Sequence, residues 1–185
     1  MRADAQRNYA KLLSAASEVF LEHGADDVSL EEIARRAGVG IGTLYRHFPT
    51  RQALLEAVYL DQVEGLRAKA DELLESGSAG EAFAAWLRAL VGFSSTKRSL
   101  TSAMVATLSK DSEVLSTCSK LIHDSADSLL ARAQQAGVAR TDVNSVDLIR
   151  LVHGVSMVTE HAPGDPGQAD RMLTLILDGL RPQAS

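Results

Sequence analysis

Four side chains that can bind a polyanion lie close together in the N-terminal part of the chain. They are two hydroxyls and two bases within five positions, namely Thr43, Tyr45, Arg46 and His47. Recognition of DNA needs cations and hydroxyl groups for the phosphates, and short side chains or bidentate donors for the base edges. Because Leu44 and Phe48 are apolar and four positions apart, they are expected to face inward and to leave the polar side chains outside.

Each of these polar side chains has an expected role. Arg46 is the favoured reader of sequence, because a guanidinium can bind O6 and N7 of guanine together; a phosphate contact is the alternative. Thr43 is expected to touch a base edge or a thymine methyl group. Tyr45 is expected to offer its hydroxyl to a phosphate, with a half-buried aromatic as the alternative. His47 is expected to contact a phosphate or the DNA backbone rather than to sense pH.

Two short predicted helices joined by a glycine turn position these side chains. Ser29 and Glu32 match the capping box, in which the hydroxyl accepts a hydrogen bond from an unpaired backbone N–H and the carboxylate reaches back. Gly38 supplies the left-handed residue that ends the first helix. The buried face of this helix is predicted from apolar residues at helical spacing, namely Leu30, Ile33, Ala34 and Ala37.

The second helix is predicted to start after Gly40 and to run to about Phe48, because Pro49 forbids its continuation. Two helices of this length separated by a short glycine turn form a helix-turn-helix. In that motif the second helix enters the major groove of DNA.

The residues of the motif resemble a known family. The segment AGVGIGTLYRHFPTRQALL is similar to the signature of the tetracycline-repressor (TetR) family of bacterial transcription factors, and LLSAASEVFLEHGADDVSLEEIA is similar to the helices that precede it. The resemblance covers roughly residues 8–56. The rest of the chain resembles the family in length and helical character, with a fainter similarity to the C-terminal domain of the subgroup named after the regulator SbtR.

Four further residues, with Gly40 at the start of the helix among them, complete the expected DNA contacts. The resemblance places Ile41 at the groove, although its spacing puts it near the apolar face, and we favour the groove. Gly42 has no side chain and would let the backbone approach the duplex closely. Arg51, at the start of the next helix, would bind phosphate as the family's usual lysine does. The expected DNA-binding set is Gly40, Ile41, Gly42, Thr43, Tyr45, Arg46, His47 and Arg51.

The expected fold is all-α, because no stretch alternates with the period of two that is typical of a strand. The resemblance implies a helix-turn-helix DNA-binding domain of three helices over residues 1–50 and a helical effector-binding and dimerisation domain over residues 51–185. About nine helices are expected: 5–23, the two helices of the motif, 51–75, 81–95, 98–109, 111–136, 142–161 and 168–181. Helix ends are expected at Gly24, Thr50 and Gly137, and at Thr141 or Asp142.

The last two predicted helices are apolar around most of their circumference. A helix with one surface to bury shows one apolar face, so nearly two such faces favour a subunit interface; central core helices of a monomer are the alternative. The resemblance implies a four-helix bundle formed with the same helices of a partner. The interface is expected to include Ile149, Val152, Met172, Leu173, Ile176 and Leu180.

The C-terminal part is also expected to hold an effector. No acid lies between Ala82 and Lys110, which favours a pocket for an anionic or neutral amphiphile. The alternative is that Lys97 and Arg98 complement the end of a helix. Candidate pocket residues, most of which are core residues on the alternative reading, are Phe83, Trp86, Phe93, Met104, His123, His153 and Met157.

Composition limits the classes of protein to which the chain can belong. The formal net charge is −5, yet residues 1–51 are balanced, so a local basic footprint is compatible with an acidic protein. The single cysteine, Cys118, excludes an internal disulfide, and no apolar run approaches a membrane span. We therefore expect a cytoplasmic protein. No metal site is expected, since His153, Glu160 and His161 are too sparse for a ligand set, and no cofactor is expected.

The expected function is a homodimeric, ligand-responsive repressor that binds a palindromic DNA operator and is released by a small-molecule effector. A TetR-like activator, or a helical interaction module without DNA binding, is the alternative. An enzyme is disfavoured, because no motif of nucleophile, zinc or phosphate chemistry is present and Cys118 and His123 are five positions apart on one helix.

Overall fold

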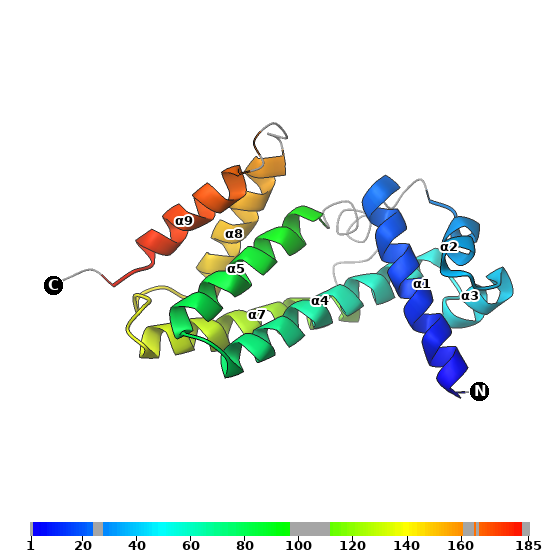
Figure 1. Ribbon diagram of the computed structural model, residues 1–185, viewed down its shortest axis with the longest axis horizontal. Helices are drawn as coiled ribbons and strands as arrows, with labels where there is room; N and C mark the ends of the chain where they lie inside the picture. The colour runs from blue at the N-terminus through cyan, green and yellow to red at the C-terminus, as the bar shows by residue number, and fades with distance from the viewer. Residues whose placement is uncertain (1, 24–27, 97–111, 161–164, 166, 183–185) are drawn as a thin grey trace. The chain divides into compact units, whose positions relative to one another are not determined.

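The computed structural model describes residues 2–23, 28–96, 112–160, 165 and 167–182. Within these ranges it contains eight helices and no strand, which confirms the all-α class (Figure 1). The helix expected near 98–109, and Gly24, lie outside the described residues. The helices are α1 (Arg2–His23), α2 (Leu30–Ala37), α3 (Ile41–His47), α4 (Arg51–Glu75), α5 (Ala79–Thr96), α7 (Glu113–Gln135), α8 (Ser145–Glu160) and α9 (Gln168–Gly179).

The chain divides into two compact units, and the division falls inside α4. Among the described residues, the N-terminal unit runs to Gln62 and includes residues 112–116, whereas the C-terminal unit holds Val63–Thr96 and the residues from Thr117 onward. The division therefore comes later than the boundary expected after residue 50. The reason is that the first turns of α4 belong to the core of the N-terminal unit.

The core of the N-terminal unit joins α1 and α2 with α3 and the start of α4. The α1 and α2 helices pack against each other, and α2 packs against α3. Gln62 of α4 donates a hydrogen bond from Nε2 to the hydroxyl oxygen of Ser17 in α1 at 2.7 Å. The buried side chains include Leu12, Ala16, Val19, Phe20, Ile33, Leu44, Phe48, Leu54, Leu55 and Val58.

The caps predicted for the helix-turn-helix are mostly present. The backbone N–H of Glu32 donates to the hydroxyl oxygen of Ser29 at 3.1 Å, and Gly38 ends α2 with a φ of 63°. The carboxylate of Glu32 accepts hydrogen bonds from Arg35 at 2.7 Å and from Arg36 at 3.0 Å instead of reaching back. Only the hydroxyl half of the capping box is therefore formed.

The other predicted helix ends agree with the structure at two positions and differ at a third. Thr50 caps α4, since its hydroxyl oxygen accepts from the N–H of Ala53 at 3.1 Å. Gly137, with a φ of 68°, follows the end of α7. The N-terminal cap of α8 is Asn144, whose side-chain oxygen accepts from the N–H of Asp147 at 2.9 Å.

The caps expected at Thr141 or Asp142 were therefore wrong. The carboxylate of Asp142 is held by Arg140, with an N···O distance of 2.6 Å, so it is turned toward that side chain rather than toward a helix start. This pair lowers the pKa of Asp142, first through the hydrogen bond from Arg140.

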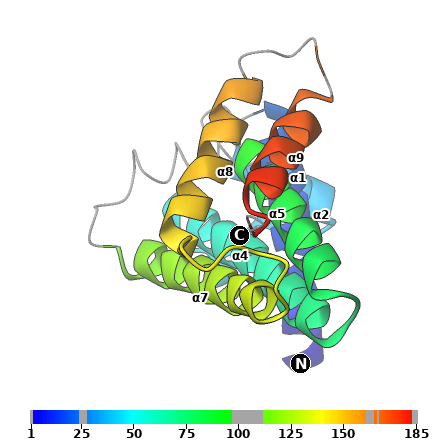
Figure 2. The same cartoon turned by 90° about the vertical axis from the view of Figure 1, so that its left-hand side faces the viewer.

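In the C-terminal unit, α5, α8 and α9 pack against one another (Figure 2). Trp86 of α5 is fully buried and donates its indole N–H to the carbonyl oxygen of Leu66 in α4 at 3.4 Å. The α7 helix is joined to the end of α4 by Arg132, which donates to the carbonyl oxygens of Leu73 at 2.8 Å and Gly77 at 3.0 Å. A cation at the C-terminal end of a helix complements the helix dipole.

Candidate nucleic-acid interface and C-terminal groove

The α3 helix presents one buried face and one open face. Leu44 and Phe48 are buried, as their spacing predicted. Tyr45 is 46% exposed, and Arg46 is exposed with no acidic partner among the described residues. Further expected DNA contacts accompany them on the helix and its start: Gly40, Ile41 and Gly42 are exposed, and Thr43 and His47 are half-buried.

Ile41 is 39% exposed and so does not join the core. A large aliphatic side chain open to water at the start of α3 favours the reading in which it touches the groove. Exposure of a single apolar residue is common in folded proteins.

Neither Gly40 nor Gly42 is required by the protein's own packing. A Cβ atom built at either position meets no heavy atom within 4 Å, and neither residue has a positive φ. Gly38 differs, because its left-handed backbone disfavours any other residue. The absence of a side chain at position 42 therefore has no internal explanation, which is compatible with a close approach of the backbone to DNA.

His47 lies in an aromatic cluster that the sequence analysis missed. Its ring contacts Tyr9 of α1 with a centroid distance of 5.8 Å and an interplanar angle of 66°. Tyr9 also contacts Phe48, at 5.1 Å. Tyr9 and His47 are 38 positions apart in sequence, so helical periodicity alone does not reveal their contact.

Arg51 is positioned differently from the expectation. Its guanidinium donates a hydrogen bond to the carbonyl oxygen of Val28, the residue before the cap of α2, and the side chain is half-buried. This contact ties the start of α4 to the chain entering α2. At least part of the donor capacity of Arg51 is therefore used inside the N-terminal unit.

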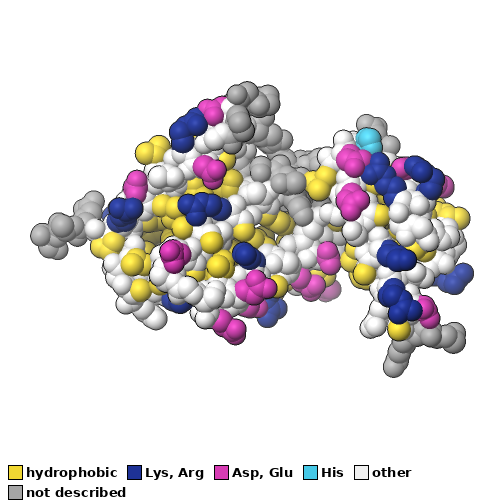
Figure 3. Space-filling view, viewed as in Figure 1, with side chains coloured by type: hydrophobic (Ala, Val, Ile, Leu, Met, Phe, Trp, Pro, Cys, Tyr) yellow, Lys and Arg dark blue, Asp and Glu magenta, His cyan; other side chains and the backbone are white. Residues whose placement is uncertain are grey.

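Arg36 is paired with acidic residues of the same unit, so it does not add an unpaired positive charge to the DNA-facing surface. It pairs with Glu22 of α1 at 2.7 Å and with Glu32 of its own helix at 3.0 Å. The hydrogen bond from Arg36 lowers the pKa of Glu22, and hydrogen bonds to Glu22 and then Glu32 raise the pKa of Arg36. Other Lys and Arg side chains lie over α1, α2 and α3 (Figure 3). Arg46 is the cation of α3 that is exposed.

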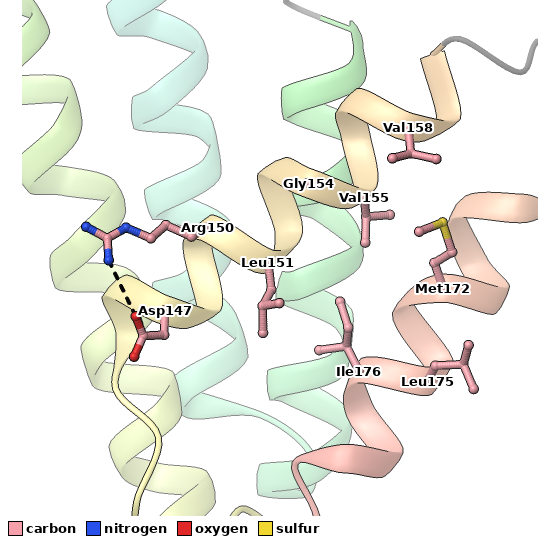
Figure 4. A pocket seen from close by; sticks show the side chains of 9 residues that line it. All are labelled: Asp147, Arg150, Leu151, Gly154, Val155, Val158, Met172, Leu175 and Ile176. Atoms are coloured by element: carbon pink, nitrogen blue, oxygen red, sulfur yellow. Dashed lines mark ion pairs between the residues drawn. The ribbon is translucent and has the colours of Figure 1, made fainter.

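The α8 and α9 helices form an open apolar groove in the C-terminal unit. It has a volume of about 710 Å³. In Figure 4, Leu151 and Val155 of α8 and Met172 and Ile176 of α9 point into the space between the helices. An ion pair between Asp147 and Arg150, at 3.5 Å, lies at one end. The remaining lining residues are Gly154, Val158 and Leu175.

Of the six residues expected at a subunit interface, four are buried within the unit itself: Ile149, Val152, Leu173 and Leu180. Met172 and Ile176 are only half-buried and line the groove. The large apolar side chains that are exposed along it are Leu151 (52%), Val158 (51%) and Leu175 (72%).

The residues expected around an effector are not all brought together. Trp86 is fully buried, and Phe83 lines a small cavity of about 240 Å³ beside Val138 and Leu177. Phe93 and His123 are half-buried, and Met157 is exposed. Met104 lies outside the described residues, as do Lys97, Arg98 and Lys110.

His123 and His153 are close enough to interact. Desolvation lowers the pKa of His153, and the nearby charge of His123 lowers it further, although the His153 side chain remains partly open to solvent. Burial raises the pKa of the Cys118 thiol to about 11, with a smaller contribution from Glu64. Searches of the described residues find no group of three metal-binding side chains and no helix able to cross a membrane.

Comparison with known proteins shows which family the chain is similar to. Residues 12–58 match the family described as bacterial regulatory proteins, tetR family, and residues 78–182 match the SbtR-like C-terminal domain of transcriptional regulators. The crystal structure of the TetR transcriptional regulator SCO0520 from Streptomyces coelicolor is 38% identical, with a TM-score of 0.79 over 95% of this chain and 99% of that one.

Two further relatives are also transcriptional regulators. A TetR regulatory protein from Mycobacterium vanbaalenii is 35% identical, with a TM-score of 0.80 over 98% of this chain and 99% of that one. The HTH-type transcriptional regulator UidR of Escherichia coli K12 is 35% identical over 75 residues, which are 40% of this chain. That match spans only 38% of the length of UidR, so the similarity is confined to part of each protein.

Proposed function

Because the chain belongs to the TetR family of bacterial transcriptional regulators, we propose that it is a homodimeric repressor, released from a palindromic operator by a small-molecule effector. Members of the family bind DNA and ligands and act as dimers, and they are regulators, not enzymes. The proposal includes a cytoplasmic location, where a regulator meets the chromosome.

The open face of α3 is the observation that carries the DNA-binding part of the proposal. Arg46 and Tyr45 are exposed on a helix whose other side is anchored by Leu44 and Phe48. A guanidinium and a phenol on the outside of the second helix of a helix-turn-helix suit contacts with base edges and phosphates. Arg46 is the proposed reader of sequence, with Thr43, Tyr45 and His47 beside it.

The groove between α8 and α9 supports the dimer. Its exposed residues Leu151, Val158 and Leu175 would be covered by the same helices of a second copy, related by a two-fold axis. Isolated exposed leucines are common, but a contiguous apolar groove is typical of an interaction site. A two-fold dimer would present two α3 helices to half-sites about 34–36 Å apart.

An effector would act through α4. This helix belongs to both units, since its first half lies in the N-terminal unit and its second half in the C-terminal unit. A ligand that binds one position of α4 better than another shifts the equilibrium between them, and a 100-fold preference corresponds to about 2.7 kcal/mol. The spacing of the two DNA-binding heads would then no longer fit the operator.

The test is an electrophoretic shift assay with the full chain and the intergenic DNA beside its own gene. We expect a specific complex that random competitor DNA does not remove and that footprints on an inverted repeat. A chain that binds both DNAs equally weakly at physiological salt would contradict the operator. A promoter–reporter fusion with and without the gene then gives the sign of regulation, with repression expected.

A further inference from the structure

We propose that Tyr9 is a positioning residue for α3, in that its ring joins α1 to His47 and Phe48 at the C-terminal end of the DNA-facing helix. The role rests on the proposed function, because it concerns how that helix is presented to DNA. It assigns no DNA contact to Tyr9 itself.

The geometry of the three rings supports this role. Tyr9 and Phe48 have centroids 5.1 Å apart at an interplanar angle of 34°, and Tyr9 meets His47 edge-on at 5.8 Å and 66°. His47 and Phe48 are 6.2 Å apart, which closes the triangle. All three distances fall in the range in which aromatic rings attract one another. Phe48 is buried and Tyr9 is 38% exposed, so the cluster runs from the core to the surface.

The α3 helix needs such an anchor because it is short. Seven residues do not form a stable helix on their own, and within α3 only Leu44 is fully buried. Phe48 ends the helix, with its N–H donating to the carbonyl oxygen of Leu44 at 2.8 Å, and Pro49 follows. The last turn, which carries Arg46 and His47, is thus held from below by Phe48.

Tyr9 supplies the lateral contact to that turn. Its edge-on arrangement with His47 restricts the rotation of the imidazole before any DNA is present. A side chain that is already ordered loses less conformational entropy when it binds, so the contact favours association without touching the ligand. The inferred function of Tyr9 is therefore to pre-organise His47 and the last turn of α3.

The test compares Tyr9→Phe, which keeps the ring, with Tyr9→Leu, which keeps apolar volume against Phe48 but removes the ring. We expect Tyr9→Phe to bind operator DNA like the wild type, and Tyr9→Leu to bind about 2- to 10-fold more weakly, the range for the cost of ordering one side chain on binding. Tyr9→Met replaces the leucine variant if that protein does not fold. A phenylalanine variant as weak as the leucine variant would overturn the proposal, because the hydroxyl and not the ring would then matter.

A double-mutant cycle separates positioning from general destabilisation. In a His47→Ala background, Tyr9→Leu should have a smaller further effect on operator affinity, because the imidazole that Tyr9 orders is gone and only its contact with Phe48 is left. In an Arg46→Ala background the two losses should add. Full additivity with His47→Ala would contradict the coupling.

A DNA-free readout keeps this inference separate from the proposed function. The imidazole protons of His47, observed by NMR in the free full-length protein, should shift in Tyr9→Leu and stay in place in Tyr9→Phe, because the ring current of Tyr9 acts on them. Unchanged His47 resonances in Tyr9→Leu would overturn the inference even if the protein binds its operator. Shifted resonances in a chain that binds no DNA would support the contact and remove only the proposed function.

Discussion

On α3, different residues anchor the helix in the protein and face the solvent. Leu44 and Phe48 are buried on the inner side, whereas Tyr45 and Arg46 are exposed on the outer side. Gly42 has no side chain, so the backbone there is accessible. A substitution on the outer side is therefore expected to change DNA binding more than folding, and one on the inner side to do the reverse.

Arg46→Ala tests direct reading of sequence. We expect specific binding to weaken by about 1–3 kcal/mol while non-specific binding changes little, because a bidentate contact with a base is lost. Fluorescence anisotropy with operator and random duplexes measures both. Arg67→Ala, on an exposed part of α4, is the matched control. Equal losses on both duplexes would make Arg46 a phosphate contact.

Gly42→Ala tests close approach of the backbone. Since a Cβ at this position meets nothing within 4 Å, we expect the protein to gain up to about 1 kcal/mol in stability from helix propensity. Operator binding should weaken at the same time. Gly65→Ala in α4, where a Cβ is equally unhindered, should stabilise without affecting DNA binding. Urea denaturation and anisotropy give the two quantities, and unchanged operator affinity would contradict the prediction.

Arg51→Ala separates an internal role from a phosphate contact. The bond to the carbonyl of Val28 predicts a loss of about 1–3 kcal/mol in unfolding free energy, typical of a partly buried acceptor left without its charged donor. A phosphate contact predicts instead that the slope of log K against log salt falls by about one unit. Denaturation and salt titration of the same variant distinguish the roles, and an unchanged slope would remove Arg51 from the DNA interface.

Among the elements, α4 has a fixed C-terminal end. Arg132 of α7 donates to the carbonyl oxygens of Leu73, Ser76 and Gly77, which otherwise have few partners at the end of a helix. Gly77, with a φ of 68°, makes the turn that follows. This clamp holds the half of α4 that lies in the C-terminal unit.

Arg132→Met should therefore destabilise the protein by about 1.5–3 kcal/mol, the range for hydrogen bonds to a charged donor. Hydrogen exchange should also quicken at the amides of the last turn of α4. Lys120→Met on the same helix removes only an exposed pair with Asp124 and should cost no more than about 0.5 kcal/mol. Equal effects of the two variants would show that the clamp contributes little.

At the scale of the whole molecule, the apolar groove of α8 and α9 determines how copies of the chain would meet. Leu175 is 72% exposed, so an aspartate there costs the single subunit little but places a charge inside the proposed interface. Leu175→Asp should lower the mass in sedimentation from about twice 19.8 kDa to that value. Operator affinity should fall with it, because two linked half-sites become independent.

Thr174→Asp is the matched control, since this neighbour on α9 is exposed and does not line the groove. It should leave both mass and operator affinity unchanged. A wild-type protein that sediments as a single subunit at the concentrations used for DNA binding would contradict the dimer.

Much of the fold was predictable because local interactions specify it. Ser29, Gly38, Thr50 and Gly137 act through hydrogen bonds or backbone angles within a few residues, and all four were placed correctly. The cap of α8 was wrong because several polar residues precede that helix. Asn144, directly before the helix, caps it, while Asp142 pairs with Arg140.

The sequence alone determined the helical class and the helix-turn-helix, because both follow from spacing and residue type along a short segment, and its resemblance to the TetR family indicated the family. Only the tertiary structure decided which side of α8 and α9 faces inward. Both sides of these helices are apolar, so periodicity cannot distinguish the buried Val152 and Leu173 from the exposed Leu151 and Leu175. The contacts of Arg36 with Glu22 and of Arg51 with Val28 also required the fold, since only packing brings these residues, which are distant in sequence, within hydrogen-bonding reach.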